Sequence, residues 1–518
     1  MRQWTPRDTR TPEDPFATPG LLTGAPFSAR LVQAYGEDNG EARRTVILEM
    51  ADGCRRQFRA ESFVDADRAR IDAEVTRHPS APDPAHYRRR DEYDADTQKL
   101  IDEGRLRVYE TQHFAIWYGV NKNGSFYKTM AEQGRPFDKV LEETGAWAEK
   151  QWLINRDVLN APLPYADSAD KQKIGIHFCG TGRPLPDDDD IRDCGASGGG
   201  AIAMGGHSTK RGSNVLTHEF AHVIQFYTGG YSGRKTAGPF WETGAEWNAF
   251  KISPTFPAQL IPYFNAPERG PVFTQSRYSN HPVLSFLFDK DDTRDLVFGA
   301  WRRNLRDTDG TSREDYFQTF VRIAKADGVY PKGWRSFADD MGWYGARLVS
   351  MDFVNQRTFL DVLSIRERPS ADSFGRKHTV PINFYTALTP VATGGQAAVY
   401  APPAQRDLME FGTHIVPLKV VGRSVKVTLT GGTTANEAAW RFTLVSVDAS
   451  GAATYAPMAA VTGRGSATVT MKPAAGAKLF LAVTATPYVY EPMGADGANN
   501  PGSPTRFPYR VDIRGATP

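Results

Sequence analysis

The chain has 518 residues, and its 62 Lys and Arg against 60 Asp and Glu leave a formal charge of only +2. This balance argues against a general nucleic-acid binder, which needs a basic surface to contact phosphates. Hydrophobic residues make up 40% and charged residues 24% of the chain, as is usual for globular proteins. At ~100–200 residues per domain, about two to four domains are expected, with enough buried apolar surface to fold without a metal. We therefore expect any metal to serve chemistry.

The length of the apolar runs, the first residues and the cysteines indicate in which cellular compartment the protein works. No run approaches the ~18 apolar residues of a membrane-spanning helix, and the first residues lack the apolar stretch of a secretory signal. The chain is then either cytoplasmic or exported with its signal removed. Cys179 and Cys194 bracket a Gly-, Pro- and Asp-rich loop that a disulfide could close, leaving Cys54 free, whereas the alternative is three unpaired thiols. We favour a secreted or periplasmic monomer.

Residues 1–100 open with a Pro-, Thr- and Asp-rich tail and contain an alternating stretch at 44–50 that predicts a strand. Charged residues dominate the segment 88–92. We expect an N-terminal extension or small β-containing module here, and its role stays open.

Strands and helices mix over residues 101–368. Segments 113–118 and 174–178 have the composition of strands, and the periodicity of 137–153 predicts a helix between them. This mixture predicts an α+β catalytic domain. From residue 369 onwards, short alternating runs such as 424–429 and 478–483 recur between turns rich in Gly, Ala, Ser and Pro. These runs predict an all-β sandwich domain over 369–518.

The segment 217–225 contains the motif His-Glu-x-x-His, formed by His218, Glu219 and His222, and Ser213 or Asn214 could cap a helix that begins before it. Because residues four apart share one face of a helix, both imidazoles can bind one zinc ion while Glu219 points at the open coordination position. The alternative is two histidines on a half-buried helix. A third ligand decides between these interpretations.

Glu242 is the candidate third ligand, in a helix predicted to begin after Pro239. Two histidines and one carboxylate form a known set of catalytic zinc ligands that leaves the fourth position to water. Glu246, one turn further, can accept a hydrogen bond from a ligand histidine and fix its tautomer. The alternative, a solvated pair of glutamates, fits poorly with their position between Trp241 and Trp247.

The motif with a downstream Glu, followed four residues later by a second acid, resembles the gluzincin metallopeptidases, which include thermolysin-like and collagenase-like enzymes. Further runs resemble the secreted Svx-like virulence peptidases of plant-pathogenic bacteria, at 113–118, 173–182, 201–204, 440–442 and 453–455. The resemblance implies a zincin domain and a secreted zinc endopeptidase of a Gram-negative bacterium. Plant cell-wall glycoproteins, such as extensins, are the candidate substrates that it implies.

The chemistry expected of such an enzyme rests on Glu219, which would take a proton from the zinc-activated water and pass it to the leaving amine. Gluzincins commonly recruit a downstream Tyr or His to stabilise the oxyanion. Tyr278 and His281 are the candidates, with a slight preference for Tyr278, and the alternative is that both belong to a segment that caps the apolar helix at 283–288.

Two further expectations concern substrate and ions. In zincins an edge strand before the zinc helix pairs with extended substrate, and Ala201, Ile202, Ala203 and Met204 are the candidates for this strand. The acidic run at 187–190 offers oxygen ligands to Ca²⁺, but it lacks the pattern of a calcium loop and is more typical of a solvated loop. Zn²⁺ is therefore the cofactor that we expect.

A binding protein is the competing class of function: a protein that recognises carbohydrate or protein, with a degenerate or structural zincin domain. Trp440 and Tyr455 could contact sugars, although core aromatics at strand spacing explain them equally well. The intact Glu219 favours the enzyme, because a degenerate zincin has little use for a carboxylate beside an open metal position. A structural zinc site would also be closed by a fourth protein ligand, and none is evident in the sequence. A non-proteolytic zinc hydrolase would use the same ligands.

Overall fold

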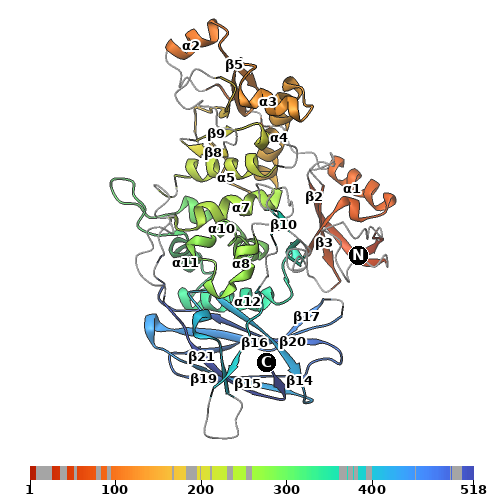
Figure 1. Ribbon diagram of the computed structural model, residues 1–518, viewed down its shortest axis with the longest axis vertical. Helices are drawn as coiled ribbons and strands as arrows, with labels where there is room; N and C mark the ends of the chain where they lie inside the picture. Colours follow the sequence, from red (N-terminus) through yellow and green to blue (C-terminus); the bar gives the residue numbers. More distant parts are fainter. Residues whose placement is uncertain are drawn as a thin grey trace.

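The computed structural model describes residues 1–6, 26–35, 44–51, 55–77, 83, 85–89, 95–165, 168–182, 195–198, 200–209, 213–229, 231, 237–252, 260–356, 358–360, 370–371, 377–378, 383–391, 399–449, 451–490, 492 and 505–518. These residues form a mixed α+β structure, as the sequence predicts. Figure 1 shows an elongated molecule with α2 and β5 at one end, two β-sheets at the other, and helices between them. No helix in the described part is long and apolar enough to cross a membrane.

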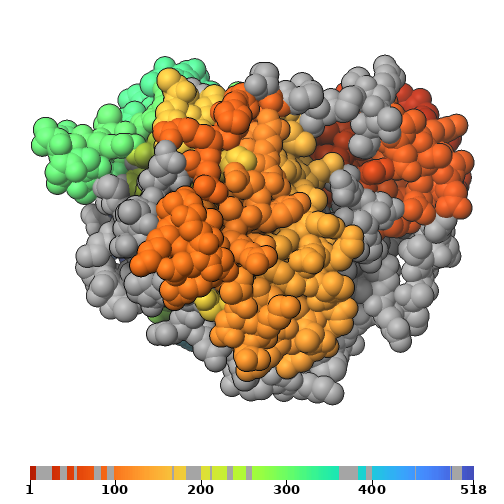
Figure 2. All heavy atoms as spheres, turned by 90° about the horizontal axis from the view of Figure 1, so that it is seen from above, coloured from red at the N-terminus to blue at the C-terminus, as the bar shows by residue number. Residues whose placement is uncertain are grey.

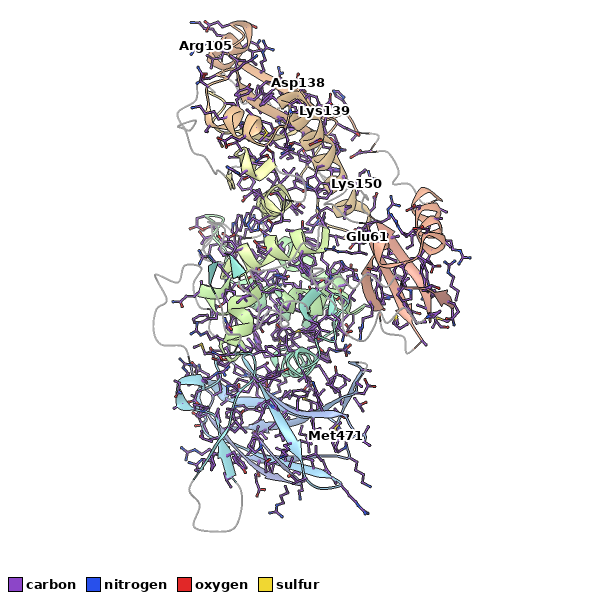
Figure 3. The ribbon with its side chains drawn as sticks, turned by 45° about the vertical axis from the view of Figure 1, so that its right-hand side comes forward. Glu61, Arg105, Asp138, Lys139, Lys150 and Met471 are labelled. Atoms are coloured by element: carbon purple, nitrogen blue, oxygen red, sulfur yellow. The ribbon has the colours of Figure 1, made fainter. Side chains whose placement is uncertain are left out.

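The N-terminal part is an antiparallel sheet with one helix. Its strands lie in the order β1 (Arg2–Trp4), β2 (Phe27–Tyr35), β3 (Thr45–Met50) and β4 (Arg55–Arg59), followed by the 3₁₀ turn η1 (Ala60–Ser62) and by α1 (Asp65–Arg77). The strand predicted at 44–50 is β3. Trp4, Phe58 and Phe63 pack together as the aromatic core of this part. In Figure 3 the sheet, with Glu61 labelled, lies beside the central helices.

A five-stranded sheet begins the central part. Its order is β5 (Leu106–Glu110), β6 (Phe114–Gly119), β7 (Ile174–Phe178), β9 (Ala201–Met204) and β8 (Gly195–Gly198). Strands β6, β7 and β9 are parallel, whereas the two edge strands, β5 and β8, are antiparallel to their neighbours. The strands expected at 113–118 and 174–178 are β6 and β7. Helices α2 (Ala95–Asp102), α3 (Ser125–Glu132) and α4 (Phe137–Asp157) accompany the sheet, and α5 (Val215–Tyr227) packs on β8 and β9.

The core of this sheet extends upstream of the domain boundary that we expected at residue 100. Tyr87 is buried in the same cluster as Phe114 and Trp152, and Arg88 forms a β-bridge with Gln172. The structural division between the N-terminal and central parts therefore lies before Tyr87. Figure 2, seen from the end that carries α2, shows the segment from α2 to α4 as one continuous surface with the N-terminal part at its side.

Helices make up the rest of the central part: α5 (Val215–Tyr227), α7 (Phe240–Ile252), α8 (Ile261–Asn265), α9 (Pro282–Asp289), α10 (Arg294–Arg302), α11 (Tyr316–Ala326) and α12 (Trp334–Leu348), with 3₁₀ turns η2 (His207–Thr209), η4 (Pro267–Arg269) and η5 (Thr274–Ser276). Two of them show clear start signals. Pro282 occupies the first turn of α9, where its missing N–H costs no hydrogen bond. Asp315 and Gln318 form a capping box at the start of α11.

The N-terminal part is fastened to the far end of α7. The Tyr35 hydroxyl donates a hydrogen bond to the Lys251 carbonyl at 3.0 Å, and the Gln57 N–H donates to the Val354 carbonyl at 2.8 Å. Lys251 is one residue from the C-terminus of α7, whereas Glu242 lies near its start. The N-terminal part thus supports the end of α7 that lies away from Glu242.

The described C-terminal part consists of β-sheets and short 3₁₀ turns. One large sheet has five strands, in the order β12 (Thr389–Pro390), β13 (Val399–Ala401), β21 (Tyr509–Arg514), β15 (Val425–Gly431) and β19 (Ser466–Met471). The other large sheet has six strands, in the order β17 (Ala453–Tyr455), β16 (Ala439–Val447), β20 (Lys478–Ala485), β14 (Thr413–Val420) and β22 (Ala516–Thr517), and β18 (Ala459–Thr462) also pairs with β16. Short elements complete this part: β10 (Ser370–Ala371), β11 (Lys377–His378), η7 (Ala404–Arg406) and η8 (Ala435–Glu437). Apolar residues of both large sheets share one core, and β15 alternates between buried and exposed positions.

Helix α12 joins the helices to the C-terminal sheets through two glycines. A Cβ on Gly342 would lie 2.4 Å from the Arg441 Cβ, and a Cβ on Gly345 would lie 2.0 Å from the Thr484 Oγ1. Hydrogen in place of a side chain therefore lets α12 approach β16 and β20 closely.

We expect Gly345→Ala to lower the free energy of unfolding by about 1–3 kcal/mol, because the added methyl overlaps Thr484 and forces the helix away from the sheet. Chemical denaturation measures the change. Gly299→Ala in α10 is the matched control, since its Cβ would meet only the Ile323 side chain, at 3.3 Å. Equal stability of the two variants would contradict the packing argument.

Asp315 links α11 to the C-terminal part. Its carboxyl accepts a hydrogen bond from the Tyr490 hydroxyl at 2.6 Å and another from the Gln318 N–H at 2.8 Å. Burial raises the pKa of Asp315 to about 7, against the lowering effect of these hydrogen bonds.

This shift predicts a pH-dependent stability. Between about pH 4 and 7 the folded protein holds a proton on Asp315 that the unfolded chain has released, so the free energy of unfolding falls as pH rises, by at most about 4 kcal/mol. Asp315→Asn keeps a capping side chain and removes the titration. Urea unfolding at pH 4.5, 6 and 8 should therefore show the variant gaining stability relative to the native protein as pH rises. A constant difference would show that Asp315 stays ionised in the fold.

Candidate metal centre

Helix α5 carries both motif histidines into the interior. The Val215 N–H donates to the Ser213 Oγ at 3.2 Å, so Ser213 rather than Asn214 provides the side-chain bond at the start of the helix. All residues from Leu216 to Gln225 are buried, because α5 packs between the central sheet and α7. The motif therefore lies in the core of the central part.

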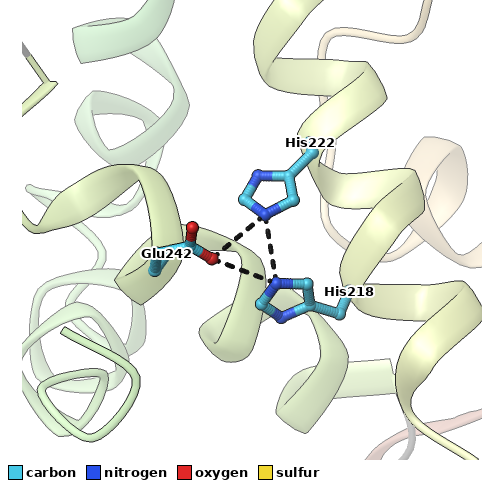
Figure 4. A group of neighbouring side chains, drawn as sticks. All are labelled: His218, His222 and Glu242. Atoms are coloured by element: carbon cyan, nitrogen blue, oxygen red, sulfur yellow. Dashed lines mark hydrogen bonds and ion pairs between the residues drawn. The ribbon is translucent and has the colours of Figure 1, made fainter. Parts of the chain in front are cut away.

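Three donor atoms converge between α5 and α7 (Figure 4). The His222 Nε2 lies 3.0 Å from the His218 Nε2 and 3.2 Å from the Glu242 Oε2, and the His218 Nε2 lies 3.3 Å from the same oxygen. Ligands at 2.0–2.1 Å from a tetrahedral zinc ion are about 3.3 Å apart. These side chains, each less than a tenth exposed, are thus spaced as three corners of one tetrahedral site, and they form a group that can hold a metal ion.

The tautomer of His222 is fixed by Gln225. The Gln225 Nε2 donates to the Trp241 carbonyl at 3.0 Å, which leaves its Oε1 to accept from the His222 Nδ1 at 2.8 Å. The proton of the imidazole is therefore on Nδ1, and the lone pair of Nε2 faces the other two donors. Trp241 also stacks on the His222 ring, with centroids 5.0 Å apart and planes 13° apart.

Glu246 lies beside the other ring nitrogen of His218. Its Oε1 is 3.1 Å from the His218 Nδ1, an ion-pair distance at which the Nδ1 makes no hydrogen bond of good geometry. A proton held on Nδ1 by this charge leaves the Nε2 free for a metal. Burial by itself lowers the pKa of His218, but Glu242 and Glu246 outweigh burial and raise the pKa to about 10. Burial likewise opposes ionisation of Glu242, yet His218 and His222 hold the pKa of its carboxyl well below the usual range. The pocket thus favours positive charge, which a divalent cation supplies.

Glu219 has the surroundings of a reactive group. Its side chain is only 7% exposed, and within the described residues no hydrogen bond or ion pair engages its carboxylate. Among the described residues, its oxygens do not belong to the fully enclosed polar atoms that lack a partner, so they are accessible to solvent. A carboxylate that is accessible and not engaged by a neighbour can accept a proton.

Tyr278 and His281 have different surroundings. The Tyr278 ring is 40% exposed and lies 6.1 Å from the His218 ring, with planes 25° apart. Burial and the charge of Glu242 raise the pKa of Tyr278. His281 is 1% exposed and packs 4.9 Å from the Phe250 ring, and burial, followed by the charge of Lys251, lowers its pKa to about 3. His281 is therefore a core residue, which corrects its expected role beside the oxyanion.

With this geometry established, one family matches the sequence: a family of unknown function, DUF6055, over residues 79–518. The chain belongs to the DUF6055 family. No curated protein matches it. The DUF6055 match contains all three metal-ligand candidates and leaves out most of the N-terminal part.

The expected substrate strand is corrected by the sheet order of this DUF6055 protein. Strand β9, which contains Ala201, Ile202, Ala203 and Met204, pairs with β7 on one side and with β8 on the other. Both of its edges are occupied, so it cannot add an extended peptide. The edge strand next to α5 is β8.

Cys179 is disulfide-bonded. Its predicted partner Cys194, the third cysteine Cys54 and the acidic run at 187–190 lie outside the described residues. The pairing of Cys179 with Cys194 and the calcium hypothesis therefore stay predictions. Sequence reasoning missed Gln225, although it stands three residues after His222 on the same face of α5. It also missed the contacts of Trp241 with Gln225 and with the His222 ring.

We expect Gln225→Ala to weaken zinc binding by about 10–100-fold, because His222 loses the bond that fixes its tautomer and orientation. Competition with a chromophoric chelator measures the affinity. Gln98→Ala, on the exposed side of α2, should leave it unchanged. Native affinity in Gln225→Ala would show that the imidazole is held by packing alone.

Proposed function

We propose that this protein is a zinc-dependent endopeptidase that cleaves proteins or glycoproteins. The observation that carries the proposal is the convergence of His218, His222 and Glu242 at 3.0–3.3 Å on the helix that also carries Glu219, or facing it. Within the described residues, no hydrogen bond or ion pair engages the Glu219 carboxylate. Three protein ligands with an adjacent carboxylate are what a catalytic zinc site requires, whereas a structural site needs a fourth protein ligand.

Each side chain then has a task. Zinc supplies, when bound, an acidified water and a polarised carbonyl. His218, His222 and Glu242 hold the ion, and Gln225 and Glu246 keep the imidazole lone pairs directed at it. Glu219 accepts the proton of the attacking water and delivers it to the leaving amine. Tyr278, whose ring lies 6.1 Å from the His218 ring, would donate its hydroxyl in a hydrogen bond to the oxygen that gains charge.

The fold and the disulfide support two finer parts of the proposal. A mixed sheet whose antiparallel edge strand β8 lies next to the motif helix supports a zincin-like domain, and β8 is the strand that we propose for pairing with substrate. The disulfide of Cys179 supports a secreted or periplasmic protein, because disulfides persist in oxidising compartments. Plant cell-wall glycoproteins remain the candidate substrates, on the sequence resemblance alone.

Separate replacements of the proposed base, Glu219, and of one metal ligand, Glu242, distinguish loss of catalytic activity from loss of zinc. Glu219→Gln should keep one zinc ion per chain and lose at least about 10²-fold in kcat on peptides, because the proton acceptor is gone while the ligands remain. Glu242→Ala should lose zinc as well as activity. Elemental analysis and cleavage of a peptide and glycoprotein panel measure both. Glu132→Gln, exposed at the end of α3, is the control.

Two outcomes would contradict the proposal. A zinc-loaded native protein that cleaves nothing in the panel would favour the binding class of function. Glu242→Ala that retains zinc and activity would show that another residue completes the site.

A further inference from the structure

Helix α7 reaches the Tyr278 loop through the residue next to the metal ligand. The Thr243 Oγ1 donates a hydrogen bond to the Arg277 carbonyl at 2.6 Å. Thr243 is fully buried, and its N–H donates a hydrogen bond to the Pro239 carbonyl. Its hydroxyl therefore connects the helix that carries Glu242 to the residue that precedes Tyr278.

The loop that this bond holds is stiff in itself. The Arg277 N–H donates to the Thr274 carbonyl at 3.1 Å, and the Ser279 N–H donates to the Ser276 carbonyl at 2.7 Å. The Asn280 Nδ2 closes the turn on the Phe273 carbonyl at 3.0 Å. A stiff turn moves as one body, so a single hydrogen bond from α7 can set where the Tyr278 ring lies.

The Tyr278 ring extends from this turn to the side of His218. The Tyr278 ring lies against His218 with planes 25° apart, and the Arg277 guanidinium lies 5.1 Å from the ring centroid. With 40% of its side chain exposed, Tyr278 has water rather than packed neighbours on part of its surface. Packing alone therefore constrains Tyr278 weakly, and the Arg277 backbone adds a constraint to those of the Glu242 and Arg277 side chains, which also interact with Tyr278.

We propose that Thr243 is a positioning residue: its hydrogen bond to the Arg277 carbonyl holds the Tyr278 hydroxyl where it would donate to an oxygen of a bound ligand or to the developing oxyanion. The proposal rests on the zinc site and on the role of Tyr278 in the proposed function. It makes α7 the source of both the carboxylate ligand and the placement of the second hydrogen-bond donor. Thr243 itself touches neither metal nor substrate.

Acetohydroxamate binding to the zinc-loaded full chain tests this placement without requiring peptidase activity. Calorimetry should show Tyr278→Phe and Thr243→Val each weakening acetohydroxamate by about tenfold, the scale of one lost hydrogen bond. The double variant should be no weaker than either single variant, because both remove one interaction. Thr243→Ser should restore native affinity. On a cleavable peptide, the same variants should lower kcat with KM little changed.

A matched control is available in α11. Thr319 is also fully buried, and its hydroxyl donates to the Glu314 carboxylate at 3.1 Å. Thr319→Val should bind acetohydroxamate as the native protein does. All variants are compared at one zinc per chain, determined by elemental analysis.

Several results would overturn the proposal. Native acetohydroxamate affinity in Thr243→Val would show that Tyr278 is placed without this bond. If the double variant lost affinity for acetohydroxamate by the product of the two single losses, the two residues would act independently. A loss of affinity in Thr243→Ser equal to that in Thr243→Val would show that packing, not the hydroxyl, is responsible. Loss of zinc in Thr243→Val would assign Thr243 to the metal site instead. A protein that binds acetohydroxamate with this pattern but cleaves no peptide would refute the peptidase and leave the positioning role intact.

Discussion

The close approach of α5 and α7 is the constraint on which the site depends. Gly244 makes it possible, because a Cβ at this position would lie 2.7 Å from the Gln225 Nε2. At this separation the Gln225 amide reaches from His222 on one helix to the Trp241 carbonyl on the other. The same approach brings a carboxylate oxygen within 3.3 Å of both imidazoles. The three donors are thereby held by two rigid helices rather than by loops.

Around this contact, the fold supports α7 at both ends. Near its start, Thr243 bonds to the loop that carries Tyr278. Near its end, Lys251 pairs with Asp289 at 2.7 Å, and the Lys251 carbonyl accepts the Tyr35 hydroxyl of the N-terminal part. A buried helix bonded along its length has little freedom to tilt, and such rigidity suits a site that must hold ligand spacing within a few tenths of an ångström.

The parts of the site that were predictable from sequence are those set by local spacing. His218 and His222 share a face because four residues make about one helical turn, and Glu246 follows Glu242 by the same interval. Gln225 obeys the same spacing, but a glutamine carries no metal chemistry and so gave no signal. His281 was misassigned because nothing in its spacing showed that Phe250 and the other aromatics of the core would enclose it.

By itself, the sequence determined the α+β class, the positions of helices α4, α5, α7 and α9 and of strands such as β3, β6 and β7, and the identities of the three donor residues. Periodicity and spacing can do this because they act within one or two turns of chain. Only the tertiary structure decided that β8 and not β9 forms the edge of the central sheet, and that Tyr278 and not His281 lies beside His218. It also decided that Gln225 orients the His222 imidazole and that Glu246 lies 3.1 Å from the His218 Nδ1. These outcomes depend on contacts between segments far apart in the chain, and such contacts are set by packing rather than by local pattern.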